Sequence, residues 1–185
     1  YSILNHINSE GVNIMTLEDP VEYPMTMIRQ TSVAETSKLN FADGVRSMMR
    51  QDPDVILVGE VRDADTAEMA FRAAMTGHQV YSTLHTNSAI GVLPRLQDIG
   101  ILPDIMAGNI IGVIAQRLVR RLCPLCKRPQ PAEAHEQRLF DFDDTRLAPI
   151  FYRPVGCERC EFQGYRGRLA IMELLRIDGD LDELI

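Results

Sequence analysis

The chain has 185 residues, 45% of them hydrophobic, and a formal net charge of −7. The length suggests one large or two small domains, and no stretch carries the run of apolar residues that a membrane-spanning helix needs. The acidic balance argues against a surface built mainly to neutralise the phosphates of nucleic acids.

Helices and strands are predicted to alternate over the first 120 residues, with short loops between them. Apolar spacing, capping residues and prolines predict these elements: a helix over 1–9, a strand over 13–17, an irregular segment over 21–39, a helix that Asn40 caps and Pro53 ends, a strand over 55–58, a helix over 64–75, a strand over 79–84, a helix from Asn87 or Ser88 to about Ile99, and a helix from Pro103 to Leu118. This order predicts an α/β fold in which helices cover the faces of a sheet.

The alternation stops near residue 120. Residues 121–168 hold all four cysteines, a polar stretch, and turns rich in glycine and arginine. We therefore expect a first domain over 1–120, a small module over 121–168 and a helical segment over 169–185. The chain starts with Tyr1 inside an apolar pattern typical of the middle of a helix, which suggests that it is part of a longer protein.

The cysteines form two Cys-x-x-Cys pairs, Cys123 with Cys126 and Cys157 with Cys160, separated by 30 residues. Each pair is a tight turn that directs two sulfurs to one point, and two such turns complete a tetrahedron of thiolates. Disulfides and separate buried thiols are the alternatives. The opening residues do not resemble a secretory signal, and the chain is long enough to form a core without cross-links. The spacing therefore favours a closed, structural zinc site.

Basic residues flank the first cysteine pair. They are Arg117, Arg120, Arg121, Lys127 and Arg128. A solvated helix end is the simpler explanation, because helix C-termini favour basic residues. The functional alternative is contact with an anionic partner, either the nucleotide of a neighbouring subunit or a membrane surface, and both stay open.

Two glutamates follow predicted strands. Glu18 comes directly after the strand over 13–17, and Glu60 follows the strand over 55–58. Ligands of open parallel sheets bind beyond the carboxyl ends of the strands, so the two carboxylates can converge on one site. Four apolar residues followed by an acid are typical of a Walker B strand. Either glutamate alone could be a surface residue, but phosphoryl transfer to water needs one carboxylate near the metal and another that orients the water.

Two histidines, His78 and His85, bracket the third strand. A lone histidine is more often a surface or core residue, but a pair beside these carboxylates could contact the γ-phosphate of a nucleotide. The expected phosphate-binding loop is absent, because the chain contains no Gly-Lys pair and therefore no GxxxxGK[ST] motif. Either the nucleotide interpretation is wrong or that loop lies before Tyr1, and the abrupt start favours the second explanation.

Several segments share a recognisable pattern. They are LEDPVEY over 17–23, RQDPDVILVGEVRD over 50–63, TGH over 76–78, STLHTN over 82–87, AQRLVRRLCP over 115–124 and GYRGR over 164–168. The first four resemble the Asp box, Walker B motif and His box of the secretion ATPase superfamily. The closest resemblance within it is to the type II secretion and type IV pilus assembly ATPases, which the cysteine pairs also fit. The resemblance covers nearly the whole chain.

The resemblance implies roles for the matching residues. Glu18 corresponds to the Asp-box glutamate that orients the attacking water or acts as general base, and Glu60 to the Walker B glutamate near Mg²⁺. Arg62 follows that acid and either holds it in place or reaches across a subunit boundary. The residues implied to lie near the nucleotide and Mg²⁺ are Asp19, Arg62, His78 and His85.

The resemblance also implies an assembly. Members of the family have a RecA-like core, the fold of P-loop NTPases, and form homo-hexameric rings with ATP between subunits. They drive pilus or pseudopilus assembly at the cytoplasmic face of the bacterial inner membrane, through an inner-membrane platform protein and a cytoplasmic adaptor. The implied cofactors are ATP, Mg²⁺ and a structural Zn²⁺, and no nucleic acid is expected as a partner. Because the phosphate-binding loop is missing, the 185 residues alone are not expected to hydrolyse ATP.

Three alternatives stay open. A nucleic-acid motor on the same core also carries cysteine pairs and basic clusters, although the acidity and the lack of interleaved aromatic and basic residues weigh against it. A pilus retraction ATPase is nearer, but such members generally lack the cysteine pairs. The third is a zinc-stabilised structural domain without activity. Between type II secretion and type IV pilus assembly the residues do not choose.

Overall fold

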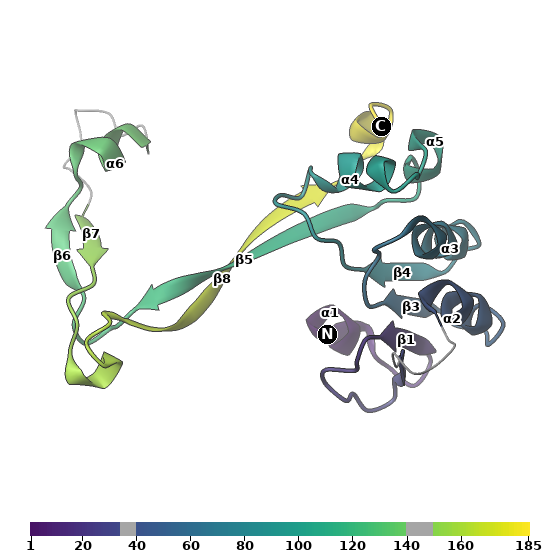
Figure 1. Ribbon diagram of the computed structural model, residues 1–185, viewed down its shortest axis with the longest axis horizontal. Helices are drawn as coiled ribbons and strands as arrows, with labels where there is room; N and C mark the ends of the chain where they lie inside the picture. Colours follow the sequence, from purple (N-terminus) through teal and green to yellow (C-terminus); the bar gives the residue numbers. More distant parts are fainter. Residues whose placement is uncertain (34–39, 140–149) are drawn as a thin grey trace. The chain divides into compact units, whose positions relative to one another are not determined.

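The computed structural model describes residues 1–33, 40–139 and 150–185. The chain divides into two compact units: residues 1–115 with 173–185, here called the sheet unit, and residues 116–172, here called the cysteine unit. The elements of the sheet unit (Figure 1) are α1 (Ser2–Ile7), β1 (Ile14–Glu18), β2 (Arg29–Ser32), α2 (Phe41–Met48), β3 (Val55–Val58), α3 (Ala64–Met75), β4 (Gln79–Ser82), α4 (Val92–Asp98), α5 (Pro103–Met106) and α7 (Gly179–Asp182). Within the described ranges, no helix has the length and apolar character to cross a membrane.

The sheet unit is organised around four parallel strands in the order β2-β1-β3-β4. The chain leaves the central strand β1 for β2 on one side, then crosses to β3 and β4 on the other side. This reversal creates a crevice at the carboxyl ends of β1 and β3, where ligands of open parallel sheets bind. Leu17 of β1 lies opposite Val58 of β3, so the two strands end almost level.

Apolar clusters cover both faces of this sheet. Met15 and Leu17 of β1 pack with Ile56 and Val58 of β3 against α2 and α3, whereas Ile14 belongs to a second cluster with Leu4 of α1. The two helices α2 and α3 therefore lie on one face and α1 on the other (Figure 1). Because side chains alternate along a strand, Thr16 and Glu18 share the face of Ile14, toward α1.

The local signals of the sheet unit are largely confirmed. The strand over 55–58 and the helix over 64–75 form with the predicted limits, and the Asn40 side chain caps α2 by accepting from the Asp43 N–H at 2.7 Å. Strand β2 lies inside the segment predicted to be irregular, residues 34–39 of which fall outside the described residues. Helix α4 begins at Val92, whereas the sequence predicted its start at Asn87 or Ser88.

Two predicted helices are wrong. The helix expected from Pro103 to Leu118 ends at Met106, and Gly112–Leu122 is instead strand β5. The segment expected to be helical over 169–185 begins within strand β8 (Tyr165–Arg176), and helix forms only at Gly179–Asp182. The two strands pair with each other and pass from one unit into the other. Long-range pairing overrides the run of apolar residues that indicated a helix up to Leu118.

The cysteine unit contains a short hairpin, a helix and the cysteine turns. Its elements are β6 (Arg128–Pro131), α6 (Ala134–Leu139), β7 (Ile150–Arg153) and the 3₁₀ helix η1 (Glu158–Cys160). Strands β6 and β7 are antiparallel, with Arg128 opposite Arg153. Residues 140–149 of the predicted module lie outside the described residues.

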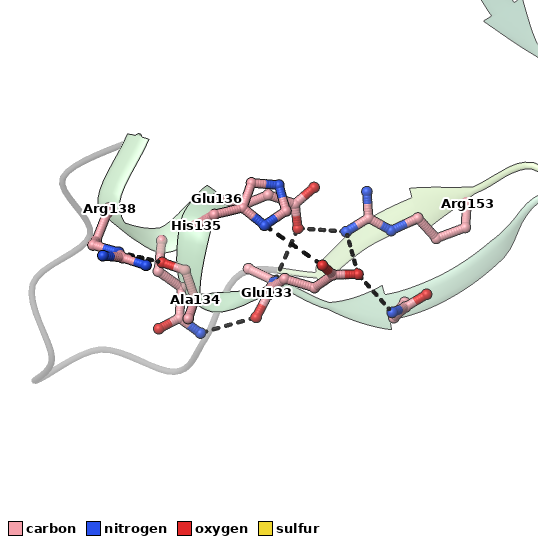
Figure 2. A network of polar contacts seen from close by, with 9 residues as sticks. Glu133, Ala134, His135, Glu136, Arg138 and Arg153 are labelled. Carbon is pink, nitrogen blue, oxygen red and sulfur yellow. Dashed lines mark hydrogen bonds and ion pairs between the residues drawn. The ribbon is translucent and has the colours of Figure 1, made fainter.

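A polar network fixes α6 to β7 within this unit (Figure 2). The largely buried Glu136 carboxylate accepts hydrogen bonds from the Arg153 guanidinium and, at 2.9 Å, from the Glu133 N–H. The Glu133 carboxylate lies 3.8 Å from the same guanidinium. The hydrogen bond from Arg153, followed by that from the Glu133 amide, lowers the pKa of Glu136. Glu136 is therefore ionised and paired at neutral pH.

The pH dependence of this network is testable with Glu136→Gln. Because the folded pKa of Glu136 is lowered, its stabilisation is complete above the usual value of 4.5 and is lost as the pH falls through the lowered value. We expect faster hydrogen–deuterium exchange of residues 128–139 in Glu136→Gln than in wild type at pH 7, and convergence of the two rates once the pH falls below the lowered pKa of Glu136. Glu158→Gln, which alters an exposed carboxylate of the same unit, is the control. Equal protection of wild type and Glu136→Gln at pH 7 would contradict the assignment.

Candidate functional site

Glu18 ends the central strand β1, and only 4% of the residue is exposed. Its Oε1 accepts hydrogen bonds from Thr16 Oγ1 at 2.6 Å and from Gln30 Nε2 at 3.1 Å. Its Oε2 accepts from the Tyr1 hydroxyl. Burial, then the hydrogen bond to Glu18, raises the pKa of Tyr1 above its usual value of 10.0, so this hydroxyl stays a donor at neutral pH. The buried carboxylate is thus surrounded by donors, as burial requires.

Gly59, directly after β3, lets the ends of β1 and β3 approach closely. Its N–H donates to the Leu17 carbonyl at 2.7 Å. A Cβ at this position would lie 3.0 Å from that carbonyl oxygen and 3.2 Å from Glu18 Cα. Both are backbone atoms, so a side chain at position 59 would force the strand ends apart. The glycine therefore brings the ends that carry Glu18 and Glu60 to one crevice.

Glu60 follows Gly59 and is held by two partners. Arg62 Nη2 pairs with Oε1, and His85 Nε2 lies 3.6 Å from Oε2. The Glu60 side chain is 13% exposed, whereas those of Arg62 and His85 are 66% and 86% exposed. Exposed ion pairs contribute little stability, so a ligand can displace either partner without unfolding the edge. The result is an anchored carboxylate beside a cation and an imidazole that can turn toward an anion.

The loop after β4 is tied to the loop after β3. Thr83 Oγ1 donates to the Gly59 carbonyl at 2.7 Å, and the Val61 N–H donates to the Thr83 carbonyl at 3.0 Å. These bonds bring the third strand's carboxyl end to the same edge as Glu60. A shallow depression of about 270 Å³ there is lined by His85, Thr86 and Asn87.

Not every predicted site residue reaches this edge. Asp19 is exposed directly after Glu18. His78 precedes β4 and so lies at the amino edge of the parallel sheet, opposite Glu18 and Glu60. Its Nδ1 lies 2.9 Å from the Ala73 carbonyl oxygen and 3.1 Å from Thr76 Oγ1. His78 therefore caps the end of α3, as basic side chains near helix C-termini commonly do.

A larger depression, of about 540 Å³, also lies at the amino edge, before β1, β2 and β3. Its lining includes the acids Glu10, Asp52 and Asp54, with Arg29 as a cation. Acidic groups repel phosphates, so its size does not make it the better site for a nucleotide. The carboxylates, the cation and the imidazole at the carboxyl edge make that edge the better candidate for a ligand site than the acidic depression.

Tyr1 and Gln30 donate hydrogen bonds to Glu18 from outside β1, and neither could be predicted from the sequence as its neighbour. Gln30 lies in the segment without periodicity, and Tyr1 reaches Glu18 only through the packing of α1. Thr16 could have been found, because residues two apart in a strand share a face.

The four cysteine sulfurs lie within 4.8 Å of one another. The Sγ atoms of Cys123 and Cys157 are 4.0 Å apart, and Cys160 Sγ lies 3.8 Å from those of both Cys126 and Cys157. A tetrahedral metal with metal–sulfur distances of about 2.3 Å would separate its sulfurs by about 3.8 Å. A disulfide would need a separation of about 2.0 Å. The arrangement fits a four-thiolate metal site and not a pair of disulfides.

Backbone amides point at these sulfurs. Gly156 donates to Cys126 Sγ, and Cys157 and Gly164 both donate to Cys160 Sγ, each at 3.3 Å. Burial raises the pKa of Cys126 to about 11, against the effect of the Gly156 N–H. Burial acts the same way on Cys160, but its two amide donors and the neighbouring Cys157 and Cys126 sulfurs together lower the pKa to about 7. Amide donors of this kind favour the thiolate form that binds metals.

Two members of the basic group stack on aromatic rings of the cysteine unit. The Arg120 guanidinium lies 4.0 Å from the ring centroid of Tyr165, and the Lys127 ammonium lies 4.4 Å from that of Tyr152. Arg117, Arg120 and Arg121 lie on strand β5. The solvated helix end that we predicted for them is therefore wrong.

Comparison with known sequences gives a match along the whole chain. Residues 1–185 match the family described as Type II/IV secretion system protein. The type II secretion system ATPase E of Vibrio cholerae serotype O1 is 49% identical over 185 residues, covering 100% of this chain and 37% of that protein. The type IV pilus assembly ATPase TfpB of Acinetobacter baylyi is 46% identical over 186 residues, covering 100% and 32%. The chain thus spans only 32% to 37% of the length of these relatives.

Solved structures show the same fold. The pilus retraction motor PilT with bound ADP superposes with a TM-score of 0.68 at 31% identity, over 99% of this chain and 43% of that chain. The Legionella pneumophila ATPase DotB gives a TM-score of 0.64 at 25% identity, over 98% and 42%.

Proposed function

The chain belongs to the type II/IV secretion system family, and on that premise we propose that it forms the carboxylate side of an ATP site in a secretion or pilus assembly motor. One observation carries the proposal. Glu18 and Glu60 extend from the carboxyl ends of adjacent parallel strands, and the backbone contact at Gly59 holds those ends together. This is where an α/β sheet of the RecA-like type places its nucleotide.

Each carboxylate has a distinct part in the proposed reaction. ATP and Mg²⁺, when bound, would supply the phosphoryl group and a cation that stabilises its negative charge. Glu60 would lie near that cation, while Glu18, screened from solvent, would orient or deprotonate the attacking water. Arg62 and His85 are exposed enough to turn toward the phosphates, and the exposed Asp19 follows Glu18 directly after β1. His78 would act from the amino edge, by fixing the end of α3.

The grip on the phosphates would come from elsewhere in the protein. The chain holds no GxxxxGK[ST] motif and spans about a third of its relatives' length. The 185 residues would therefore need the rest of the full-length protein, and the ring of its homo-hexamer, to turn over ATP.

The proposed role is assembly rather than retraction. Identity reaches 49% with a type II secretion ATPase and 46% with a type IV pilus assembly ATPase, against 31% with the retraction motor PilT. The cysteine pairs support the same choice. The motor would act at the cytoplasmic face of the inner membrane, through a platform protein in the membrane and a cytoplasmic adaptor.

The cysteine unit would bind Zn²⁺ as a structural ion. All four positions of the tetrahedron are filled by sulfur, which leaves no open position for a substrate. Buried cysteines form the apolar cluster of this unit, so the metal would replace the core that so small a unit lacks. The unit is proposed to contact partners and to take no part in hydrolysis.

Zinc content tests this part of the proposal. We expect about one zinc per chain after native purification, and loss of the metal in Cys126→Ser, because three thiolates do not close the tetrahedron. Chelation should also remove the protection of the cysteine unit from proteolysis. His135→Asn removes an exposed imidazole of the same unit that could bind zinc adventitiously, and should keep the full content. A metal-free protein that is protected as well as the zinc-bound form would contradict the site.

Turnover of ATP by the full-length protein tests the role of Glu18. Glu18→Gln keeps the shape of the side chain but removes the carboxylate, so kcat should fall by about 10²- to 10⁴-fold, as expected for a lost general base. The affinity for ATP should stay near that of wild type, because the phosphates are held elsewhere. Glu22→Gln, four residues further on in an exposed position, is the matched control and should keep its activity. Undiminished turnover in Glu18→Gln would end the assignment.

A further inference from the structure

The amide of Gln30 in β2 uses its donor and acceptor atoms in three hydrogen bonds. Its Nε2 donates to Glu18 Oε1 and to the Tyr23 carbonyl, both at 3.1 Å, and its Oε1 accepts from the Met25 N–H at 2.6 Å. The reversed orientation of the amide would place its oxygen against a carboxylate and its NH₂ against an N–H. The surroundings therefore fix which end of the amide faces Glu18.

The sheet itself delivers Gln30 to this place. Strand β2 runs parallel to β1 with Gln30 opposite Thr16. Thr16 and Glu18 share one face of β1, and the Gln30 side chain lies on that face, where it reaches the carboxylate two residues further along. The same amide holds Tyr23 and Met25 of the segment that connects β1 to β2.

The hydrogen bonds divide the two oxygens of Glu18 into different tasks. Each carboxylate oxygen can accept about two hydrogen bonds. Oε1 already accepts from Thr16 and Gln30, whereas Oε2 accepts from the Tyr1 hydroxyl. Oε1 is therefore saturated, and Oε2 keeps the capacity to accept from one more donor.

We propose that Gln30 is a positioning residue for the hydrolytic reaction: with Thr16 it occupies Oε1 of Glu18 and so commits Oε2 to the attacking water. This inference rests on the proposed function of Glu18. Gln30 touches neither nucleotide nor water in this account and acts through the carboxylate. The Tyr1 hydroxyl donates to the second oxygen of Glu18, Oε2. The neighbouring Glu60 carboxylate has partners of its own, Arg62 and His85.

The test uses Gln30→Met and Thr16→Val in the full-length protein. Gln30→Met preserves the length of the side chain and removes all three bonds, while Thr16→Val removes the other donor to Oε1 and leaves the connecting segment in place. Each should lower kcat by about tenfold to a hundredfold, the effect of one hydrogen bond to a charged group. ATP affinity should stay close to wild type, whereas the thermal midpoint should fall by a few degrees in both variants, because each removes hydrogen bonds at a buried carboxylate. Gln79→Met is the matched control, because the Gln79 side chain donates to the Tyr81 hydroxyl of the same strand, at the opposite edge of the sheet.

A double-mutant cycle separates positioning from general damage. If Gln30 acts through Glu18, then Gln30→Met should cause no further loss of kcat in a Glu18→Gln background. Multiplicative losses, or wild-type kcat in both Gln30→Met and Thr16→Val, would overturn the inference while leaving Glu18 as the hydrolytic residue. Undiminished turnover in Glu18→Gln alone would instead remove the proposed function on which the inference rests. Should Gln30→Met fail to fold, Thr16→Val decides the question in the same way.

Discussion

The close contact between the ends of β1 and β3 is the constraint on which the proposed site depends. The Gly59 N–H donates to the Leu17 carbonyl at 2.7 Å, and a Cβ at position 59 would lie only 3.0 Å from the same carbonyl oxygen. The fully buried Leu17 and Val58 side chains, packed under α2 and α3, keep the two strands in this register. Glu18 is the last residue of β1 and Glu60 comes two residues after the end of β3, so the paired strands position both carboxylates without a long loop. A rigid edge of this kind suits chemistry that relies on positioning more than on new bonds to the protein.

The cysteine unit is stabilised by different means. Its buried cluster consists of cysteines, and α6 is attached through the ion-paired Glu136 and Arg153. A unit with so little apolar core needs a staple, and four sulfurs in a tetrahedron provide one when a metal is bound. The paired strands β5 and β8 each run from one unit into the other, so two strands of the chain join the cysteine unit to the sheet unit.

The sequence was sufficient to predict elements that depend on interactions between residues close together in the chain. The buried run over 55–58, the helix over 64–75 and the Asn40 cap form as predicted, and the spacing of the cysteines was enough to bring their sulfurs together. The signals failed where distant residues decide. Much of strand β5 was predicted to be helical, because its partner strand β8 lies some fifty residues further along the chain. Gln30 could not be predicted as a neighbour of Glu18, because only the β1–β2 register places it there. The resemblance put His78 near a nucleotide, whereas the direction of β4 puts it at the amino edge.

The most direct test of the account is a structure of the full-length hexamer with Mg²⁺ and a non-hydrolysable ATP analogue. We expect the γ-phosphate to lie at the carboxyl edge of the sheet, with Glu60 near the cation. We also expect a water between the phosphorus and Glu18, with its oxygen about 3 Å from Oε2 of Glu18. A phosphate chain at the amino edge, beside His78 or in the acidic depression near Asp54, would contradict it.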